Sequence, residues 1–115
     1  MNSDRFLDML ARTLLEEPEL FLSLHVGPPE RDGQHELGST TRLPVTLSRV
    51  GPGALINSNV MEFTAGVDGT ITHYGVWMQR DGGDYLTGGI WAMPVRVTAG
   101  QPIRVREAEI ALRFG

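Results

Sequence analysis

Hydrophobic residues follow two patterns along the chain, and the first of them is helical. From Ser3 onward apolar residues recur at helical spacing, with Ser3 placed to cap the helix and Asp4 suited to its first turn. Pro18 ends the pattern. The sequence therefore predicts a short amphipathic α-helix over residues 1–17, with an apolar face formed by Phe6, Leu7, Leu10, Leu14 and Leu15.

The next run, ELFLSLHVG at residues 19–27, alternates between two faces. Such alternation predicts a strand with one buried face. The apolar face holds Leu20, Leu22, Leu24 and Val26. The opposite face holds Phe21, Ser23 and His25. The following segment, residues 30–42 (ERDGQHELGSTTR), has Leu37 as its one apolar residue, which predicts a mobile, solvated loop able to reach a neighbouring subunit or a ligand.

Six further runs have the composition of strands and are separated by turn sequences rich in glycine, proline and aspartate. They are LPVTLSRV, ALINSNVMEF, TITHYGVWMQ, DYLTGGIWAM, VRVT and IRVREAEIALRF. In the last run the apolar parity changes between Val105 and Ala108, which predicts a bulge or bend near Glu107. The chain is thus expected to be one mainly β domain of residues 1–115, an antiparallel β-sandwich over 18–115 preceded by the helix.

Composition narrows the possible partners. The net charge is −4 and basic residues form no run, so we expect neither nucleic acid nor an anionic membrane surface as a partner. No apolar run approaches the ~20 residues of a membrane span, and the N-terminus lacks the blocks of a signal peptide. The absence of cysteine excludes disulfides, thiolate catalysis and thiolate metal sites.

The stretch GTITHYGVW at residues 69–77 holds the most chemistry, but it fits a buried strand better than an active site. Strict alternation would place Ile71, His73, Gly75 and Trp77 on one face, and Thr72, Tyr74, Val76 and Met78 on the other. A glycine within a strand needs a ring or backbone lying against it, and we expect Tyr74 or Trp91 to supply the ring at Gly75. His73 could serve as a base or metal ligand, yet no second histidine stands at a ligand spacing.

The sequence gives little support for other kinds of catalytic or binding site. Asp81 and Asp84 flank two glycines, which favours a charged hairpin tip over a calcium site. No nucleophile elbow, phosphate loop or dinucleotide fingerprint occurs, so we expect no cofactor, no metal and no catalytic residue. Exposed aromatic rings could stack on sugars, and the candidates for glycan binding are Tyr74, Trp77, Tyr85 and Trp91.

The order of motifs from Asn57 onward resembles a family of small tailed-bacteriophage proteins described as tail-fibre or minor structural proteins. The motifs are NSNVMEF, then DGTITHYGVW with its Thr72-His73-Tyr74-Gly75 centre, then GGDYLTGGIW, and then PVRVTAGQPI before a closing strand. The resemblance covers residues 57–114 in detail and the first 56 in outline. It implies a structural role in the virion and not an enzyme.

From the resemblance we expect a non-enzymatic subunit on the surface of a tailed-phage virion. It would be a capsid decoration (cement) protein or an accessory tail or tail-fibre subunit that stabilises the particle through symmetric contacts with other virion proteins and itself, as a homotrimer. The candidate interface residues are Phe6, Leu10, Leu14, Arg31, Arg42, Arg49 and Arg80. Two alternatives stay open: a receptor-recognition module that binds host-surface glycans, and a small hydrolase that uses His73.

Overall fold

The computed structural model describes residues 19–29, 33–51 and 54–113, and this part of the chain is mainly β with antiparallel sheets. The helix expected over residues 1–17, with Phe6, Leu10 and Leu14 on its apolar face, lies outside the described residues. Within the described ranges there is no α-helix, and hence no helix long and apolar enough to cross a membrane.

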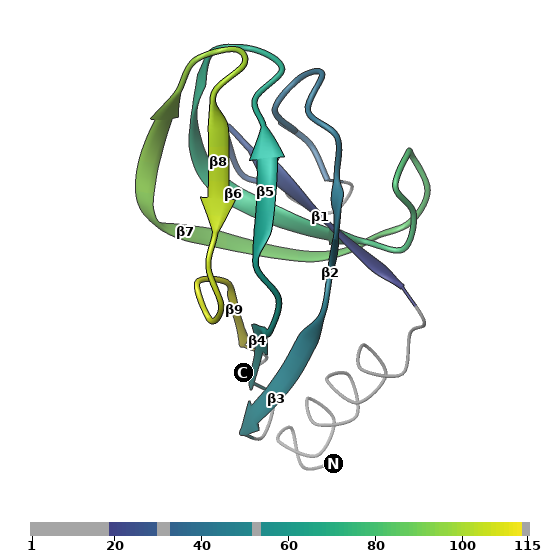
Figure 1. Ribbon diagram of the computed structural model, residues 1–115. Coiled ribbons are helices and arrows are strands. Elements are labelled where there is room, and N and C mark those ends of the chain that lie inside the picture. Colours follow the sequence, from purple (N-terminus) through teal and green to yellow (C-terminus); the bar gives the residue numbers. More distant parts are fainter. Residues whose placement is uncertain (1–18, 30–32, 52–53, 114–115) are drawn as a thin grey trace.

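Within the described residues, nine strands form three sheets (Figure 1). The four-stranded sheet has the order β2 (Leu43–Val45), β1 (Leu20–His25), β6 (Gly69–Trp77) and β7 (Tyr85–Val97). The three-stranded sheet has the order β3 (Leu47–Gly51), β4 (Ala54–Asn57) and β9 (Ala111–Arg113). The third sheet pairs β5 (Met61–Thr64) with β8 (Pro102–Val105). The strands thus divide into three sheets, and the two-sheet sandwich stays a prediction.

Three of the strand-like runs are each broken into two strands that enter different sheets. The break between β2 and β3 falls at Thr46, the break between β4 and β5 spans 58–60, and the break between β8 and β9 spans 106–110. By contrast, residues 84–93 and 95–98 were expected as separate strands, and the structure joins most of them into β7. Apolar composition marks extended backbone but not the point where a strand leaves one sheet for another.

The change of parity near Glu107 is a bend, as the sequence predicted. Ala108 has a positive φ of 61°, and the chain turns there between β8 and β9. Asn57 holds this turn in place: its side-chain Nδ2 donates to the Arg106 carbonyl at 2.8 Å, and its Oδ1 accepts from the Ile110 N–H at 2.8 Å. The fully buried Asn57 therefore ties the end of β4 to the β8–β9 link.

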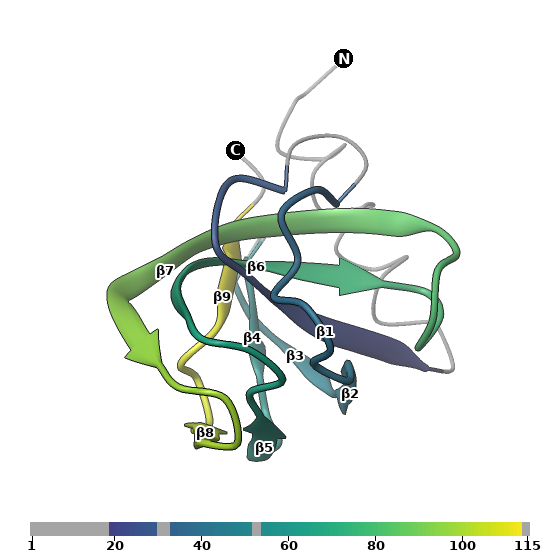
Figure 2. The ribbon, with the colours of Figure 1, turned by 90° about the horizontal axis from the view of Figure 1, so that it is seen from above.

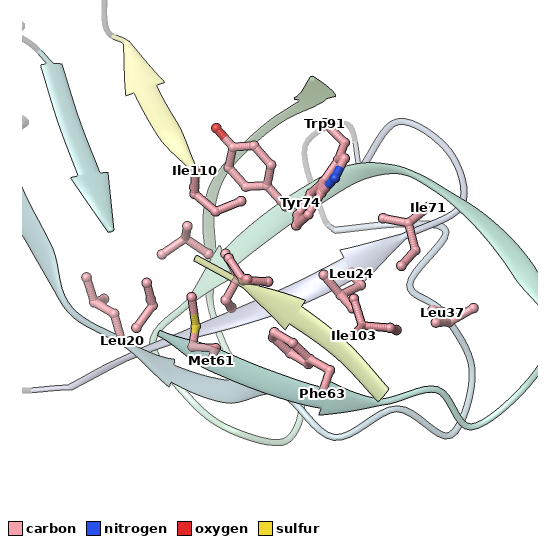
Figure 3. Close-up of a cluster of buried hydrophobic side chains, with 14 of the residues drawn as sticks. Leu20, Leu24, Leu37, Met61, Phe63, Ile71, Tyr74, Trp91, Ile103 and Ile110 are labelled. Carbon is pink, nitrogen blue, oxygen red and sulfur yellow. The ribbon is translucent and has the colours of Figure 1, made fainter. Parts of the chain in front are cut away.

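The hydrophobic core lies between the four-stranded sheet and the β5–β8 pair, which face each other in Figures 1 and 2. β5 and β8 contribute alternating side chains, with Phe63 and Val105 almost completely buried. Tyr74 and Trp91 meet edge to face with their ring centroids 6.3 Å apart. Figure 3 shows part of this cluster, which gathers side chains from all three sheets. Packing across the sheets thus fixes their arrangement.

β1 departs from the expected strand with one buried face, because all six of its residues are buried. Leu22 and Leu24 face the core, while Phe21, Ser23 and His25 lie on the other side of the sheet and are covered there as well. Val26, which was expected on the buried face, lies beyond the strand and is exposed. A second layer must therefore cover the outer face of this sheet.

β6 is a central strand, but its faces differ from strict alternation. The pairing with β7 shifts between Ile71 and His73, so Ile71 joins Tyr74 and Val76 in the core instead of sharing a face with His73. Such an irregularity shifts the side-chain phase by one residue. The ring against Gly75 is also not the expected one: a Cβ there would lie 3.0 Å from Tyr85 Cε1 and 2.8 Å from His25 Nε2.

Replacing Asn57 by alanine is expected to destabilise the fold by about 3 kcal/mol, because three hydrogen bonds are lost and buried partners are left without replacements. Asn59→Ala is the matched control, since Asn59 bonds Thr46 and Pro44 at the surface, where water can substitute, and its loss is expected to cost about 1 kcal/mol. Urea denaturation of both variants measures the difference. Equal losses would contradict the central role of Asn57.

Candidate functional site

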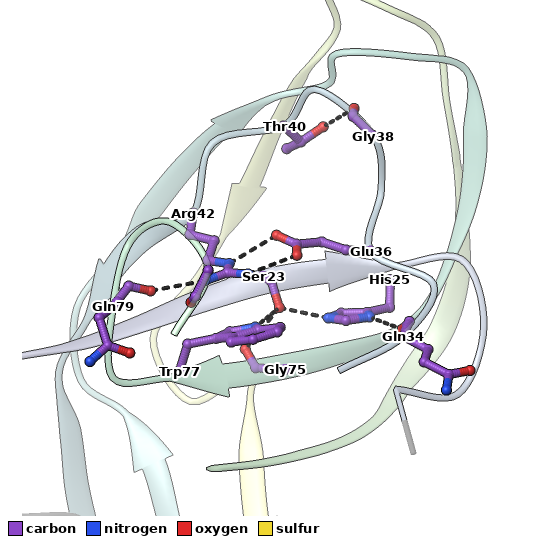
Figure 4. Close-up of polar contacts among 11 residues, drawn as sticks. Ser23, His25, Gln34, Glu36, Gly38, Thr40, Arg42, Gly75, Trp77 and Gln79 are labelled. Carbon is purple, nitrogen blue, oxygen red and sulfur yellow. Dashed lines mark hydrogen bonds and ion pairs between the residues drawn. The ribbon is translucent and has the colours of Figure 1, made fainter. Parts of the chain in front are cut away.

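Three polar side chains that could carry chemistry meet on the outer face of the four-stranded sheet. Ser23 and His25 come from β1 and Trp77 from β6 (Figure 4). Ser23 Oγ lies 2.6 Å from His25 Nε2 and accepts a hydrogen bond from Trp77 Nε1 at 2.7 Å. We call these three residues the polar layer.

The hydrogen bonds of the polar layer define the proton positions on His25. Its Nδ1 lies 2.6 Å from the Gln34 carbonyl oxygen, which can only accept, so Nδ1 carries the proton. Nε2 of the neutral ring is then the acceptor, and the Ser23 hydroxyl donates to it. Burial lowers the pKa of His25, opposed by its bond to the backbone of Gln34, so the neutral ring is favoured.

A serine hydroxyl that donates to a neutral histidine is the arrangement of a nucleophile and its base, but here both side chains are buried. Ser23 and His25 are essentially without solvent contact. A Cβ added at Gly75 would approach both Ser23 Oγ and His25 Nε2 to 2.8 Å, which shows how closely the backbone of β6 covers the pair. No substrate carbonyl can reach Ser23 Oγ in this structure. The polar layer therefore joins β1 to β6 and to the segment above them.

That segment is residues 33–42, which we call the strap. Backbone hydrogen bonds hold it to β1 and its end: Leu37 N donates to Leu24 O at 2.7 Å and Val26 N to His35 O at 2.8 Å. Gly33, with φ of 75°, packs against the Trp77 ring so closely that no side chain would fit. Residues 33–42 are thus tied to β1 at several points, yet most of them are exposed or half-buried, as a solvated loop should be, and the mobility of the loop stays a prediction.

Arg42 closes the strap over the polar layer. Its guanidinium lies 3.5 Å from the centroid of the Trp77 ring and donates twice to the Glu36 carboxylate, at 3.0 Å each. It also donates to the carbonyls of Gln79 and Gly82 in the β6–β7 hairpin tip, at 3.0 and 2.8 Å. With 7% of its surface exposed, Arg42 is committed to contacts within the chain, contrary to its expected place at an interface.

The other candidate interface residues have varied positions. Arg49 on β3 and Arg80 in the hairpin tip are exposed, and the Arg80 guanidinium lies 5.3 Å from the centroid of the Phe21 ring. Arg31 lies outside the described residues, as do Phe6, Leu10 and Leu14. Arg49 and Arg80 thus remain candidates whose side chains reach the surface.

His73 lies opposite His25 in the pairing of β1 with β6, but its hydrogen bond is to Thr72 and not to the polar layer. Its Nδ1 is 2.8 Å from Thr72 Oγ1, and it borders a shallow hollow of about 440 Å³ with Pro29, Tyr85 and Ile90. In the part of the chain that the structure describes, no three histidine, aspartate or glutamate side chains group as metal ligands do. Asp81 and Asp84 lie in the exposed turn between β6 and β7, as expected of a hairpin tip.

Three of the four aromatic residues proposed for glycan binding are buried. Tyr74 and Trp91 pack in the core, and Trp77 lies beneath Arg42. The Tyr74 hydroxyl donates to the Ala111 carbonyl at 2.7 Å, and burial raises the pKa of Tyr74 to about 12. Only Tyr85 of the four is partly accessible, and its ring meets Trp77 edge to face at 5.2 Å. These rings therefore form no sugar-stacking platform.

The two most exposed large apolar side chains among the described residues lie on β7. Ile90 and Met93 are 77% and 73% exposed, and Leu86 is partly exposed. The one sign of this exposure in the sequence is that TGGIWAM contains no charged residue. Alternation alone does not predict which of the neighbours Ile90 and Trp91 is exposed and which is buried. β7 is therefore the candidate interaction surface.

The neutral, buried His25 predicts a pH dependence of stability. Because the pKa of His25 is lowered by folding, the unfolded chain binds the proton first, and stability falls as the pH drops below about 6.5, by up to about 1.4 kcal/mol per pH unit. Urea denaturation between about pH 7.5 and pH 5.5 measures this slope. His25→Asn should be less stable but lose the slope. An unchanged slope in His25→Asn would contradict the assignment.

Arg42→Lys should destabilise the fold by about 2 kcal/mol, because lysine keeps the charge but cannot make the paired bonds to Glu36 and reach both hairpin carbonyls. Limited proteolysis should then cut first within the strap. Arg80→Lys is the control, since Arg80 is exposed and should tolerate the change. A strap equally resistant in both variants would contradict the closing role of Arg42.

Comparison with known proteins identifies the family. A family model described as Podophage GP4 fiber I protein gp80 matches residues 2–113, whereas comparison with curated proteins finds no match. The match confirms the resemblance to phage tail-fibre proteins and extends it over nearly the whole chain. A phage fibre family implies association with the virion. The chain belongs to the phage fibre family described as Podophage GP4 fiber I protein gp80.

Proposed function

We propose that this chain is a non-enzymatic structural subunit of a fibre on the tail of a phage particle. The match of the fibre family over residues 2–113 carries the proposal, and it favours the tail over the capsid-decoration role that was the other expectation. The subunit would be made in the host cytoplasm and act in the assembled virion. Its work would be binding between subunits, because burial repeated by symmetry stabilises a particle without chemistry.

The polar layer supports a structural role over a hydrolase. The one serine–histidine pair among the described residues is enclosed by the strap, by β6 and by Arg42. His73, on which the hydrolase alternative depended, is bonded to Thr72 and has no carboxylate partner in the described part of the chain. The polar side chains that could do chemistry are thus used to hold the layers of the fold together.

The partners we propose are other virion proteins and further copies of this chain, with neither nucleic acid nor membrane. The accessible candidates for such contacts are Arg49, Arg80 and the exposed apolar side chains of β7. The candidates Phe6, Leu10, Leu14 and Arg31 keep their proposed role in a stretch outside the described residues. The homotrimer and the two-sheet sandwich likewise stay predictions.

Glycan recognition is the weaker proposal. It depended on exposed aromatic rings, and among the four candidates only Tyr85 reaches the surface. A single partly covered ring offers little stacking area for a sugar. No observation on the described surface raises this alternative to the level of the structural role.

Quantitative mass spectrometry of purified particles tests the proposal. A tail-fibre subunit should be present in low copy number, in fixed ratio to tail proteins, and antibody labelling should place it at the tail. The major capsid protein of the same particles is the internal reference. Absence from the particle would contradict a structural role, and a copy number comparable to that of the capsid protein would contradict the tail location.

A further inference from the structure

The first part of the strap, residues 33–36, covers a histidine that has no contact with solvent. His25 is 0% exposed, and its Nδ1 donates to the Gln34 carbonyl at 2.6 Å. His25 also forms an isolated β-bridge with Glu36, so the strap crosses the histidine at two successive points (Figure 4). If residues 33–36 left the sheet, water would therefore reach the His25 ring.

A proton on His25 Nε2 would reverse the hydrogen bonding of the polar layer. The neutral ring accepts from the Ser23 hydroxyl, whereas the charged ring can only donate. Ser23 Oγ would then accept from both His25 and Trp77, and its own hydrogen would be left with the Gly75 carbonyl at 3.4 Å. That distance is longer than a good O–H···O bond, so protonation weakens the layer.

The charged and titratable groups that face His25 give a buried imidazolium little compensation. The carboxylate among them is Glu36 of the strap, which is already bonded twice to Arg42. Arg42 itself and His73 of β6 disfavour a charge on His25. The Tyr85 ring of β7 lies nearby and is uncharged, because burial raises its pKa.

Water at the ring would relieve the main cost of the proton. The bond to the Gln34 carbonyl favours the charged form of His25, but burial has the larger effect and lowers the pKa of His25. A group whose pKa is lowered by its cover binds a proton more readily once the cover is gone. The uncovered state should therefore gain population as the pH falls.

The contacts of the strap divide it into a part that is held and a part that is free to move. Leu37 is buried in the core, and Arg42 is bonded to the carbonyls of the hairpin tip. Residues 33–36 contribute no side chain to the hydrophobic core. They can therefore leave the outer face of the sheet while the core on its other face stays packed.

We propose that residues 33–36 are a proton-operated latch, closed over His25 while its ring is neutral and released from the sheet when the ring takes up a proton. Release exposes Ser23, His25 and Trp77 on the outer face of β1 and β6. It creates no catalytic pair, because the exposed histidine is charged and cannot act as a base. The inference goes beyond the proposed fibre role and does not depend on it.

Hydrogen exchange of two backbone amides in the unmodified chain tests the latch. Val26 N donates to His35 O at 2.8 Å and Gln34 N to Pro29 O at 2.7 Å, so both amides lose protection when the latch is released. An uncovered histidine titrates near about 6.5, so release should rise up to about tenfold between about pH 7.5 and about pH 5.5. The protection of both amides, corrected for the exchange of an unstructured amide, should fall by the same factor.

Low concentrations of urea distinguish release of the latch from unfolding of the whole chain, because the urea dependence scales with the surface that is exposed. At the lower pH the exchange of Val26 and Gln34 should hardly respond to urea. Leu37 N, which donates to Leu24 O at 2.7 Å, should instead follow global unfolding. A urea dependence shared by all three amides would overturn the inference, as would protection that does not change with pH.

Two variants assign the response to one histidine. His25→Asn should abolish the pH dependence of the Val26 and Gln34 amides, because asparagine cannot take up the proton. His35→Asn is the matched control: His35 is exposed within the latch, and asparagine tolerates its positive φ of 65°. A response that survives in His25→Asn or disappears in His35→Asn would overturn the inference. Should His25→Asn fail to fold, the urea experiment on the unmodified chain still decides between a latch and global unfolding.

Discussion

The fold depends on one constraint: β1 is buried on both faces while it carries two polar side chains on one of them. A serine and a histidine without water must find partners within the protein, and each lost partner costs about 1–3 kcal/mol. Ser23, His25 and Trp77 satisfy one another, and the last bond goes to the backbone of Gln34 in the strap. The outer face of the sheet therefore needs the strap, which supplies the hydrogen-bond partner of His25 Nδ1.

The rest of the structure repeats this use of buried polar groups at places where the chain changes sheets. Asn57 fixes the turn between β8 and β9, and the Tyr74 hydroxyl links the core to β9. Because β8 and β9 are short, apolar packing alone would leave their register weakly defined. Directional bonds supply that register, while the apolar cluster between the sheets supplies most of the stability.

Alternation in the sequence predicted the mainly β fold, the bend near Glu107 and the central position of GTITHYGVW. It could not predict the second buried face of β1, because burial there depends on the strap, whose residues are polar and give no periodic signal. It also placed Arg42 at an interface, since a sequence does not reveal that Trp77 and the hairpin carbonyls lie within reach of its guanidinium. For the same reason the sequence did not reveal the hydrogen bond between Ser23 and His25. The pair is structural because the surrounding chain buries it, which its residue types alone do not show.

Arg42 also has a consequence for the order in which the chain folds and opens. Its bonds to Gln79 and Gly82 span 37 and 40 residues, so they can form only after the β6–β7 hairpin has brought those carbonyls into place. Contacts made after the main barrier slow unfolding without slowing folding. We therefore expect the Arg42 bonds to add to the kinetic stability of the fold, which determines how long a native protein persists where no chaperone refolds it.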